Sequence, residues 1–332
     1  MSRFSLMKVA VYYNNKDVRI AERPKPQIRD GEILVKVRAC GICGTDVMEW
    51  YRIKKAPRVL GHEMAGDIVE SKSDKFSTGE RVFVSHHVPC NVCKYCLAGN
   101  HTACETLHNG NYEPGGFSEF VRVPAINVLY GTYVLPSNVS YEEATMIEPL
   151  ACVVRAQRIM DVGKGHTVLV MGCGISGLLN IVVAKLRGAR VVATDVNAYR
   201  LSKANEYGAD VAADARKEIG VKADRIVMCT GAKQAFDNAF RYADRKGVIM
   251  LFAIPSEKIS IPNADFWRNE LSLVSSYGAA PDDLLEALEL IGKKKVDVLR
   301  MITDRVRLDD IQKGFDVASA AKESLKVVVV FS

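Results

Sequence analysis

The segment Gly172-Cys173-Gly174-Ile175-Ser176-Gly177 constrains the fold more than any other stretch of the chain. It follows an apolar, β-branched run, Thr167–Met171, and opens a helical pattern over Ile175–Arg187. In such a strand–turn–helix the first glycine permits a tight turn, the second lets the backbone approach a pyrophosphate, and the third lets helix and strand pack closely. The helix N-terminus offers free N–H groups and a positive dipole to phosphate oxygens. The segment therefore predicts a dinucleotide site on an α/β sheet.

An acidic residue stands where such a site needs one. Asp195 comes 18 residues after Gly177, at the end of the strand expected at Arg190–Thr194. A carboxylate there accepts hydrogen bonds from a ribose diol and repels the 2′-phosphate of NADP, so NAD is the expected cofactor. The alternative is a structural glycine-rich turn with Asp195 as a loop cap. The residues expected to bind the cofactor are Gly172, Gly174, Ile175, Gly177, Asp195, Arg200 and Thr230.

Strand and helix patterns alternate from about Ala151 to Ala280, which implies crossover connections and a doubly wound parallel sheet. The expected strands are Thr167–Met171, Arg190–Thr194, Arg225–Cys229 and Val248–Phe252, and the expected helices are Ile175–Arg187, Ala198–Tyr207 and Lys233–Asp244. The first ~145 residues are instead β-rich, because short β-branched segments alternate there with turn residues. Those segments include Glu32–Ala39, Met64–Glu70 and Arg81–Ser85; a helix from Pro281 and a strand at Leu325–Phe331 complete the chain.

Composition excludes several classes of protein. The 332 residues suit two domains, and 48% hydrophobic with 25% charged residues is ordinary for a globular protein. The net charge of +6 is spread along the chain, so neither nucleic acid nor a membrane surface is an expected partner. The longest apolar runs are far shorter than the ~20 residues of a membrane-spanning helix. The N-terminus has no apolar leader pattern, so a cytoplasmic location is expected.

Four of the nine cysteines are bunched as C-x2-C-x2-C-x7-C, at Cys90, Cys93, Cys96 and Cys104. Thiolates with two residues between them can bind one ion from a single turn of chain, and the fourth closes a tetrahedron. The main rival is an iron–sulfur cluster, for which bacterial chains use a last gap of three residues followed by proline. Here the gap is longer and Glu105 follows. The pattern predicts a closed, structural zinc site that holds a small lobe together.

Further metal-ligand types occur in Cys40-Gly41-Ile42-Cys43-Gly44-Thr45-Asp46, Gly61-His62-Glu63 and Glu148-Pro149-Leu150. Each is unremarkable alone. Together with the four-cysteine lobe and the glycine turn, in this order and at these distances, they make the chain resemble the zinc-dependent medium-chain dehydrogenase/reductase family over nearly its whole length. Within that family it resembles the sorbitol, threonine and sugar-alcohol dehydrogenases more than the ethanol enzymes.

The resemblance implies a GroES-like catalytic domain at residues 1–147 and 281–332, and an NAD-binding Rossmann domain at 148–280. It implies that Cys43 and His62 ligate a catalytic zinc, while Glu63 and Glu148 match acids that bind this zinc directly or exchange with water. Asp46 matches the carboxylate that orients the ligand histidine. Thr45 matches the hydroxyl that takes the substrate's proton, while hydride passes to the nicotinamide. Two zinc ions per subunit follow, together with a homodimer or homotetramer.

Two departures from the family pattern limit what the resemblance implies. Met48 stands where the family often has a histidine that relays the proton, and methionine cannot relay protons. A route through water past Glu49 or Glu63 remains open. The dipeptide Ser276-Tyr277 stands where the sorbitol enzymes have arginine before tyrosine, which argues against sorbitol itself.

The expected activity is oxidation of a secondary alcohol, a polyol or related sugar, to a ketone. An amino alcohol of the threonine type and a sugar-alcohol phosphate remain alternative substrates. A different class of function is an NAD-binding protein that keeps the fold and has lost the reaction. Zinc content discriminates these readings, because the enzyme should hold about two zinc ions per chain and the non-catalytic protein one.

Overall fold

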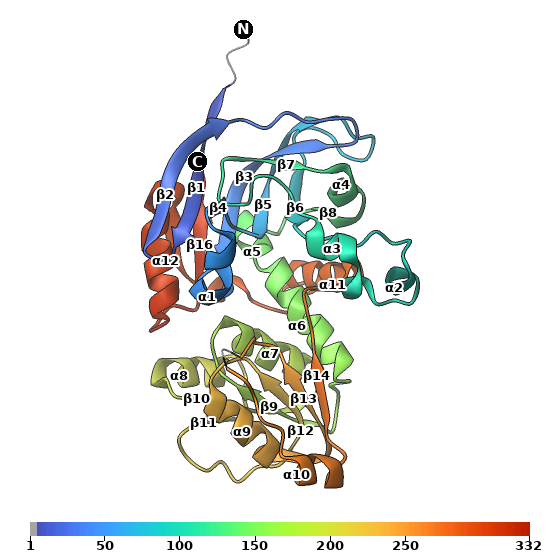
Figure 1. Cartoon of the computed structure of the whole chain (residues 1–332), viewed down its shortest axis with the longest axis vertical. Helices are drawn as coiled ribbons and strands as arrows, with labels where there is room; N and C mark the ends of the chain where they lie inside the picture. The colour runs from blue at the N-terminus through green and yellow to red at the C-terminus, as the bar shows by residue number, and fades with distance from the viewer. Residues whose placement is uncertain (1–4, 256) are drawn as a thin grey trace. The chain divides into compact units, whose positions relative to one another are not determined.

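The computed structural model describes residues 5–255 and 257–332 (Figure 1). The chain divides into two units: one comprises the chain up to Glu148 together with Ala279–Ser332, and the other comprises Pro149–Gly278. Helix α6 (Ile147–Ile159) carries the chain from one unit to the other. Within the described ranges, no helix combines the length and the apolar character that crossing a membrane requires.

The second unit is built on a parallel sheet, and its described strands follow the order β11-β10-β9-β12-β13-β14. This is the order of a doubly wound nucleotide-binding sheet, so the predicted Rossmann fold is confirmed. Its elements are β9 (Thr167–Met171), α7 (Ile175–Leu186), β10 (Arg190–Asp195), α8 (Ala198–Glu206), β11 (Val211–Asp214), β12 (Ala223–Met228), α9 (Lys233–Tyr242), β13 (Ala243–Leu251), α10 (Asn263–Arg268) and β14 (Ser272–Ser275).

The first unit contains two sheets. A three-stranded sheet has the order β2-β1-β4, and a larger sheet has the order β15-β16-β3-β5-β6-β8, with β7 paired to β3. The strands are β1 (Leu6–Asn14), β2 (Asp17–Pro24), β3 (Ile33–Ile42), β4 (Arg58–Val59), β5 (Glu63–Ser71), β6 (Arg81–Ser85), β7 (Phe120–Val123), β8 (Thr132–Val134), β15 (Ile302–Arg307) and β16 (Lys326–Val330). The helices are α1 (Glu49–Arg52), α2 (Lys94–Leu97), α3 (Glu105–Asn109), α4 (Ala125–Gly131), α5 (Tyr141–Ala144), α11 (Pro281–Gly292) and α12 (Ile311–Ala320), with short 3-10 turns at Ile53–Lys55, His101–Ala103, Leu299–Met301 and Leu308–Asp310.

The end of the chain returns to the first unit. The C-terminal strand β16, red in Figure 1, pairs antiparallel with the blue strand β3. The core of this unit joins residues from both ends of the sequence, since Tyr12 packs with a tilted ring and Phe117 edge-on against Phe315 of α12. The C-terminal segment is therefore an integral part of this unit.

Strand register brings residues from separate segments to one edge of the larger sheet. Gly41 of β3 pairs with Glu63 of β5, and Glu63 pairs with Ser85 of β6. On the other side of β3, Ile42 pairs with Val327 of β16. The residues that adjoin these positions therefore gather at the same place, although the sequence separates them widely.

Candidate functional site

A thiol, an imidazole and a carboxylate meet at this edge of the sheet. One donor atom from each of Cys43, His62 and Glu63 lies within 4.8 Å of the other two. Cys43 directly follows β3, and His62 directly precedes β5, which begins at Glu63. Zinc takes such ligands, and a site with three protein ligands keeps one position for water or substrate. The donor set fits a catalytic zinc ion.

Asp46 supports His62 from a fully buried position. Its Oδ1 lies 3.5 Å from Nδ1 of His62, and its Oδ2 accepts the backbone N–H of Cys43 at 3.1 Å. Burial alone would raise the pKa of Asp46, but His62 and Arg52 outweigh it and lower the pKa. Burial likewise opposes a charged His62, yet Asp46 and Cys43 raise its pKa well above 6.5. A site that favours positive charge in this way also favours a metal cation.

Thr45 is held by two side chains of the same loop. Its hydroxyl donates to Sγ of Cys43 at 3.3 Å, and it accepts from Nη2 of Arg52 at 2.9 Å. Arg52 also donates from Nε to the backbone oxygen of Thr45 at 2.9 Å and contacts Oδ1 of Asp46 at 3.3 Å. The single turn α1 brings Arg52 back beside Thr45, so a guanidinium fixes the position of this hydroxyl.

Glu63 is engaged on one oxygen only. Its Oε2 is hydrogen-bonded to Nζ of Lys326, the first residue of β16, and the two side chains are 0% and 1% exposed. Its other oxygen, Oε1, is buried and has no hydrogen-bond partner. A buried carboxylate oxygen without a partner is costly. A zinc ion held with Cys43 and His62 would satisfy it.

Glu148 stands outside the group of three. It lies in the first turn of α6 and is buried at 9% exposure. In the described part of the chain, the donor atoms that lie within 4.8 Å of one another here belong to Cys43, His62 and Glu63. The charge of Glu148 nevertheless acts on Lys326, which contacts Glu63. Burial disfavours the Lys326 ammonium, but Glu63 and Cys43, with a smaller contribution from Glu148, raise the pKa of Lys326 above 10.5.

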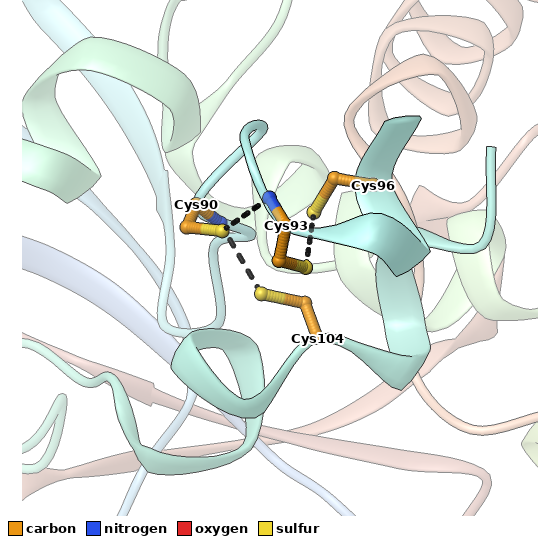
Figure 2. A group of neighbouring side chains, drawn as sticks. All are labelled: Cys90, Cys93, Cys96 and Cys104. Carbon is orange, nitrogen blue, oxygen red and sulfur yellow. Dashed lines mark hydrogen bonds between the residues drawn. The ribbon is translucent and has the colours of Figure 1, made fainter. Parts of the chain in front are cut away.

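The four cysteines of the lobe converge around one point, with all four sulfurs within 4.8 Å of one another (Figure 2). Backbone N–H groups point at the sulfurs: that of Cys93 donates to Cys90 at 3.3 Å, and that of Cys90 donates to Cys104 at 3.4 Å. Burial would raise the pKa of Cys104, but the N–H groups of Cys90 and Leu107 outweigh it and lower the pKa to about 6. N–H donors that stabilise thiolates, in a closed set of four, fit a structural zinc ion.

The glycine turn has the geometry that its sequence predicts. Gly172 adopts a φ of 97°, in the left-handed region, and Gly174 caps α7 with nothing within 4 Å of the place a Cβ would take. A Cβ on Gly177 would overlap the carbonyl oxygen of Gly172. The three glycines therefore supply the turn, an open approach to backbone N–H groups, and close packing of helix on strand.

The other expected cofactor residues surround this turn. Asp195 ends β10 and is 6% exposed; it accepts the N–H of Cys173 at 2.7 Å and that of Asn197 at 2.8 Å. Burial and Asp195 raise the pKa of Cys173 to about 12, and the charge of Arg200 opposes them, so Arg200 acts on the same turn. Cβ of Thr230 lies 3.2 Å from the place a Cβ on Gly172 would take. Asp195 thus holds the glycine turn in place, and its role toward a ribose diol stays a prediction.

Comparisons with known proteins agree with a zinc site in the first unit and a nucleotide-binding fold in the second. Residues 29–132 match the family description "Alcohol dehydrogenase GroES-like domain", and residues 176–293 match "Zinc-binding dehydrogenase". A relative described as L-threonine 3-dehydrogenase, from Pectobacterium carotovorum subsp. carotovorum, is 32% identical over 93% of this chain and 94% of its own length. The chain is a zinc-dependent medium-chain dehydrogenase. A sorbitol dehydrogenase of Bacillus subtilis is 29% identical and covers 97% of each chain.

Solved structures resemble this dehydrogenase over almost its whole length. A putative zinc-binding dehydrogenase of Sinorhizobium meliloti bound to NADP has a TM-score of 0.87 at 27% identity, covering 98% of this chain and 100% of that one. An alcohol dehydrogenase of E. coli with NADH has a TM-score of 0.88 at 28% identity, with the same coverage. Zinc and a nicotinamide dinucleotide are therefore the cofactors of the family to which this enzyme belongs.

Four residues at the metal group are not among those that sequence reasoning singled out. Lys326 and Arg52 contact Glu63 and Thr45 as described above. The ring centroid of His86 lies 4.9 Å from that of His62, and that of His87 lies 3.7 Å from that of His86. A lysine within the apolar run Lys326–Val330 and a histidine pair at the end of β6 are signals that a reader of the sequence could have used.

Proposed function

We propose that this enzyme oxidises a secondary alcohol, a polyol or related sugar, to a ketone with NAD as the hydride acceptor. The observation that carries the proposal is the group of Cys43, His62 and Glu63 with the hydroxyl of Thr45 beside it. The three ligands would hold a zinc ion, which when bound lowers the pKa of an alcohol hydroxyl.

Other residues of the chain would position the ligands and accept the substrate's proton. Asp46 keeps His62 in a fixed orientation, and Arg52 keeps the Thr45 hydroxyl in place. Thr45 is the group that would receive the substrate's proton, as in general base catalysis through a hydroxyl. Lys326 holds Oε2 of Glu63, which leaves Oε1 free for the metal. Glu148 lies outside the group of three and would be available to exchange onto the metal.

Asp195 supports the assignment of NAD. A buried carboxylate at the end of β10 repels an added 2′-phosphate and suits a ribose diol. Arg200 acts on the same turn and would moderate this preference. Similar structures have been solved with NADH and with NADP, so the fold alone does not select the nucleotide. The preference for NAD is therefore argued from the residues of this chain.

The relatives support the class of substrate. Their descriptions include sorbitol, L-threonine and L-galactonate dehydrogenases, whose substrates carry a polar group beside the reacting carbon. These substrates share a secondary alcohol beside a polar group, and the proposal adopts the polyol or sugar-like form that sorbitol and L-galactonate represent. A homodimer or homotetramer in the cytoplasm stays a prediction.

A panel of polyols, sugars, amino alcohols and simple secondary alcohols tests the proposal, with NADH formation followed by absorbance. We expect turnover with polyols, about two zinc ions per chain, and loss of turnover in Cys43→Ala. The matched control is Cys40→Ala, since Cys40 is a buried core residue that lies near the site and does not belong to the metal group. Absence of turnover with every alcohol, in protein that holds two zinc ions, would contradict the proposal.

A further inference from the structure

Two amide side chains lie fully buried in the second unit, one on each of the helices that precede and follow β9. Gln157 of α6 donates from Nε2 to the backbone oxygen of Asn180 of α7 at 2.7 Å and to its Oδ1 at 3.2 Å. Both residues are 0% exposed. The proposed function gives neither of them a role, although the glycine turn opens the helix that carries Asn180.

Asn180 joins two segments that the chain order separates. Its Nδ2 donates to the backbone oxygen of Ser176, in the first turn of α7, at 2.9 Å, and to Sγ of Cys229, which directly follows β12, at 3.6 Å. The backbone N–H of Cys229 in turn donates to the oxygen of Met171, the last residue of β9, at 2.8 Å. One side chain therefore ties the start of α7 to the chain that leaves β12.

These two segments border the place where a parallel sheet of this kind binds its ligand. The described strand order β11-β10-β9-β12-β13-β14 reverses its direction between β9 and β12, and ligands bind outside the carboxyl ends of the strands at such a switch point. The place a Cβ on Gly172 would take is 3.0 Å from the backbone oxygen of Cys229, so the two borders are already closely packed at the base. The Asn180 bridge therefore sets how the start of α7 stands over this crevice.

The amide pair is not the arrangement that stability alone would favour. Oε1 of Gln157 is buried without a hydrogen-bond partner, which costs free energy in a folded protein. The neighbouring residues Leu179 and Ile181 are fully buried and apolar, and leucines at both amide positions would leave no acceptor of this pair unsatisfied. Because replacing both partners of a buried hydrogen bond by apolar groups is often nearly neutral, the pair points to a role in placing the backbone of α7.

We propose that Asn180 and Gln157 are positioning residues for the dinucleotide: Asn180 fixes the first turn of α7 relative to the end of β12, and Gln157 holds the Asn180 amide in that orientation. The inference rests on the proposed function, because it takes NAD to lie at this switch point. The free N–H groups of the first turn would then meet the pyrophosphate at hydrogen-bonding distance, and such bonds weaken steeply outside a narrow range of distance and angle. The part of the ligand that the pair serves is the pyrophosphate and not the adenosine, which Asp195 would meet.

Binding measurements on the zinc-loaded enzyme test the proposal with three probes: NADH, ADP-ribose, which keeps the pyrophosphate, and AMP, which lacks it. The double variant Gln157→Leu/Asn180→Leu should bind NADH and ADP-ribose about tenfold more weakly than the wild type, as the loss of one hydrogen bond to a charged group implies. Its affinity for AMP and its melting temperature should stay near the wild-type values. In turnover, KM for NAD should rise and kcat at saturating NAD should not change.

Two further variants separate positioning from a merely structural role. Cys229→Ala removes the acceptor that follows β12 and keeps both amides, so it should weaken ADP-ribose binding in the same way. It carries the same test if the double variant does not fold. Val183→Ala, a buried truncation farther along α7, is the matched control: it should lower the melting temperature and leave all three affinities unchanged.

An affinity for ADP-ribose that the double variant and Cys229→Ala both leave intact would overturn the inference. So would an equal loss of affinity for AMP and ADP-ribose, or a loss that follows the melting temperature in every variant, Val183→Ala included. A wild-type enzyme that holds zinc and binds neither NADH nor ADP-ribose would instead overturn the proposed use of NAD, and the inference with it.

Discussion

The buried pair of Lys326 and Glu63 allows a quantitative prediction. Replacing Lys326 by methionine keeps the length and apolar character of the side chain and removes the ammonium group. Because the two side chains are 1% and 0% exposed, Lys326→Met leaves the Glu63 carboxylate buried without its counter-charge. Breaking such a pair from one side costs about 3–5 kcal/mol, since an uncompensated charge stays in the interior.

The expected change in melting temperature follows from the size of the unit. The first unit has about 200 residues, for which 1 kcal/mol corresponds to roughly 2–4 °C, so Lys326→Met should melt about 6–20 °C below the wild type. The double variant Glu63→Met/Lys326→Met removes both charges and should recover most of this loss, because apolar replacements of buried pairs are close to neutral. The pKa of Lys326 is raised above 10.5 by Glu63 and Cys43 against burial, so the ammonium is present at pH 7.5. The contribution of this ammonium group to the free energy of unfolding is lost only as the pH rises through that raised pKa.

Differential scanning calorimetry at pH 7.5 measures the three proteins after chelator treatment and again with zinc. Chelation also empties the cysteine lobe, but this affects all three proteins equally. Zinc should reduce the cost of Lys326→Met, because a metal ion replaces the lysine as the counter-charge of Glu63. The reasoning is refuted if the single variant melts within about 2 °C of the wild type. It is also refuted if the double variant melts as low as the single one.

Three other predictions address the remaining sites. Thr45→Val should lower kcat by about a hundredfold or more while Thr45→Ser retains most of it; equal kinetics in both variants would remove Thr45 from the proton path. Asp195→Ala should lower the preference of kcat/KM for NAD over NADP by about tenfold or more, and an unchanged ratio would contradict the ribose role. Cys93→Ala should lose one zinc ion per chain and lower the melting temperature more than it alters kcat of the protein that remains folded. A variant that is stable and inactive would argue against a structural lobe.

Local patterns were sufficient where the chemistry is local in sequence. The glycine turn spans six residues, and the geometric demands on Gly172, Gly174 and Gly177 are met by the absence of a side chain alone. The cysteine lobe is equally compact, because Cys90, Cys93 and Cys96 lie within one short stretch. The alternation of strands and helices likewise predicts the parallel sheet. The predicted elements omit α6 and α12, since neither has flanking signals as clear as the glycine turn.

Cys43, His62 and Glu63 were expected together only because the chain resembles a known family, since nothing in their spacing brings them to one point. The register of β3, β5 and β6 does so, through the pairing of Gly41 with Glu63 and of Glu63 with Ser85. The same register places His86 beside His62.

The sequence by itself determined the nucleotide-binding fold, the four-thiolate lobe and the residue types available for a catalytic metal, because each of these depends on neighbours along the chain. Only the tertiary structure decided the surroundings of that metal. Lys326 reaches Glu63 across 263 positions of sequence, and Arg52 closes on Thr45 through one helical turn. Such contacts depend on which strands lie next to each other and in what register, and that is settled by packing of the whole unit.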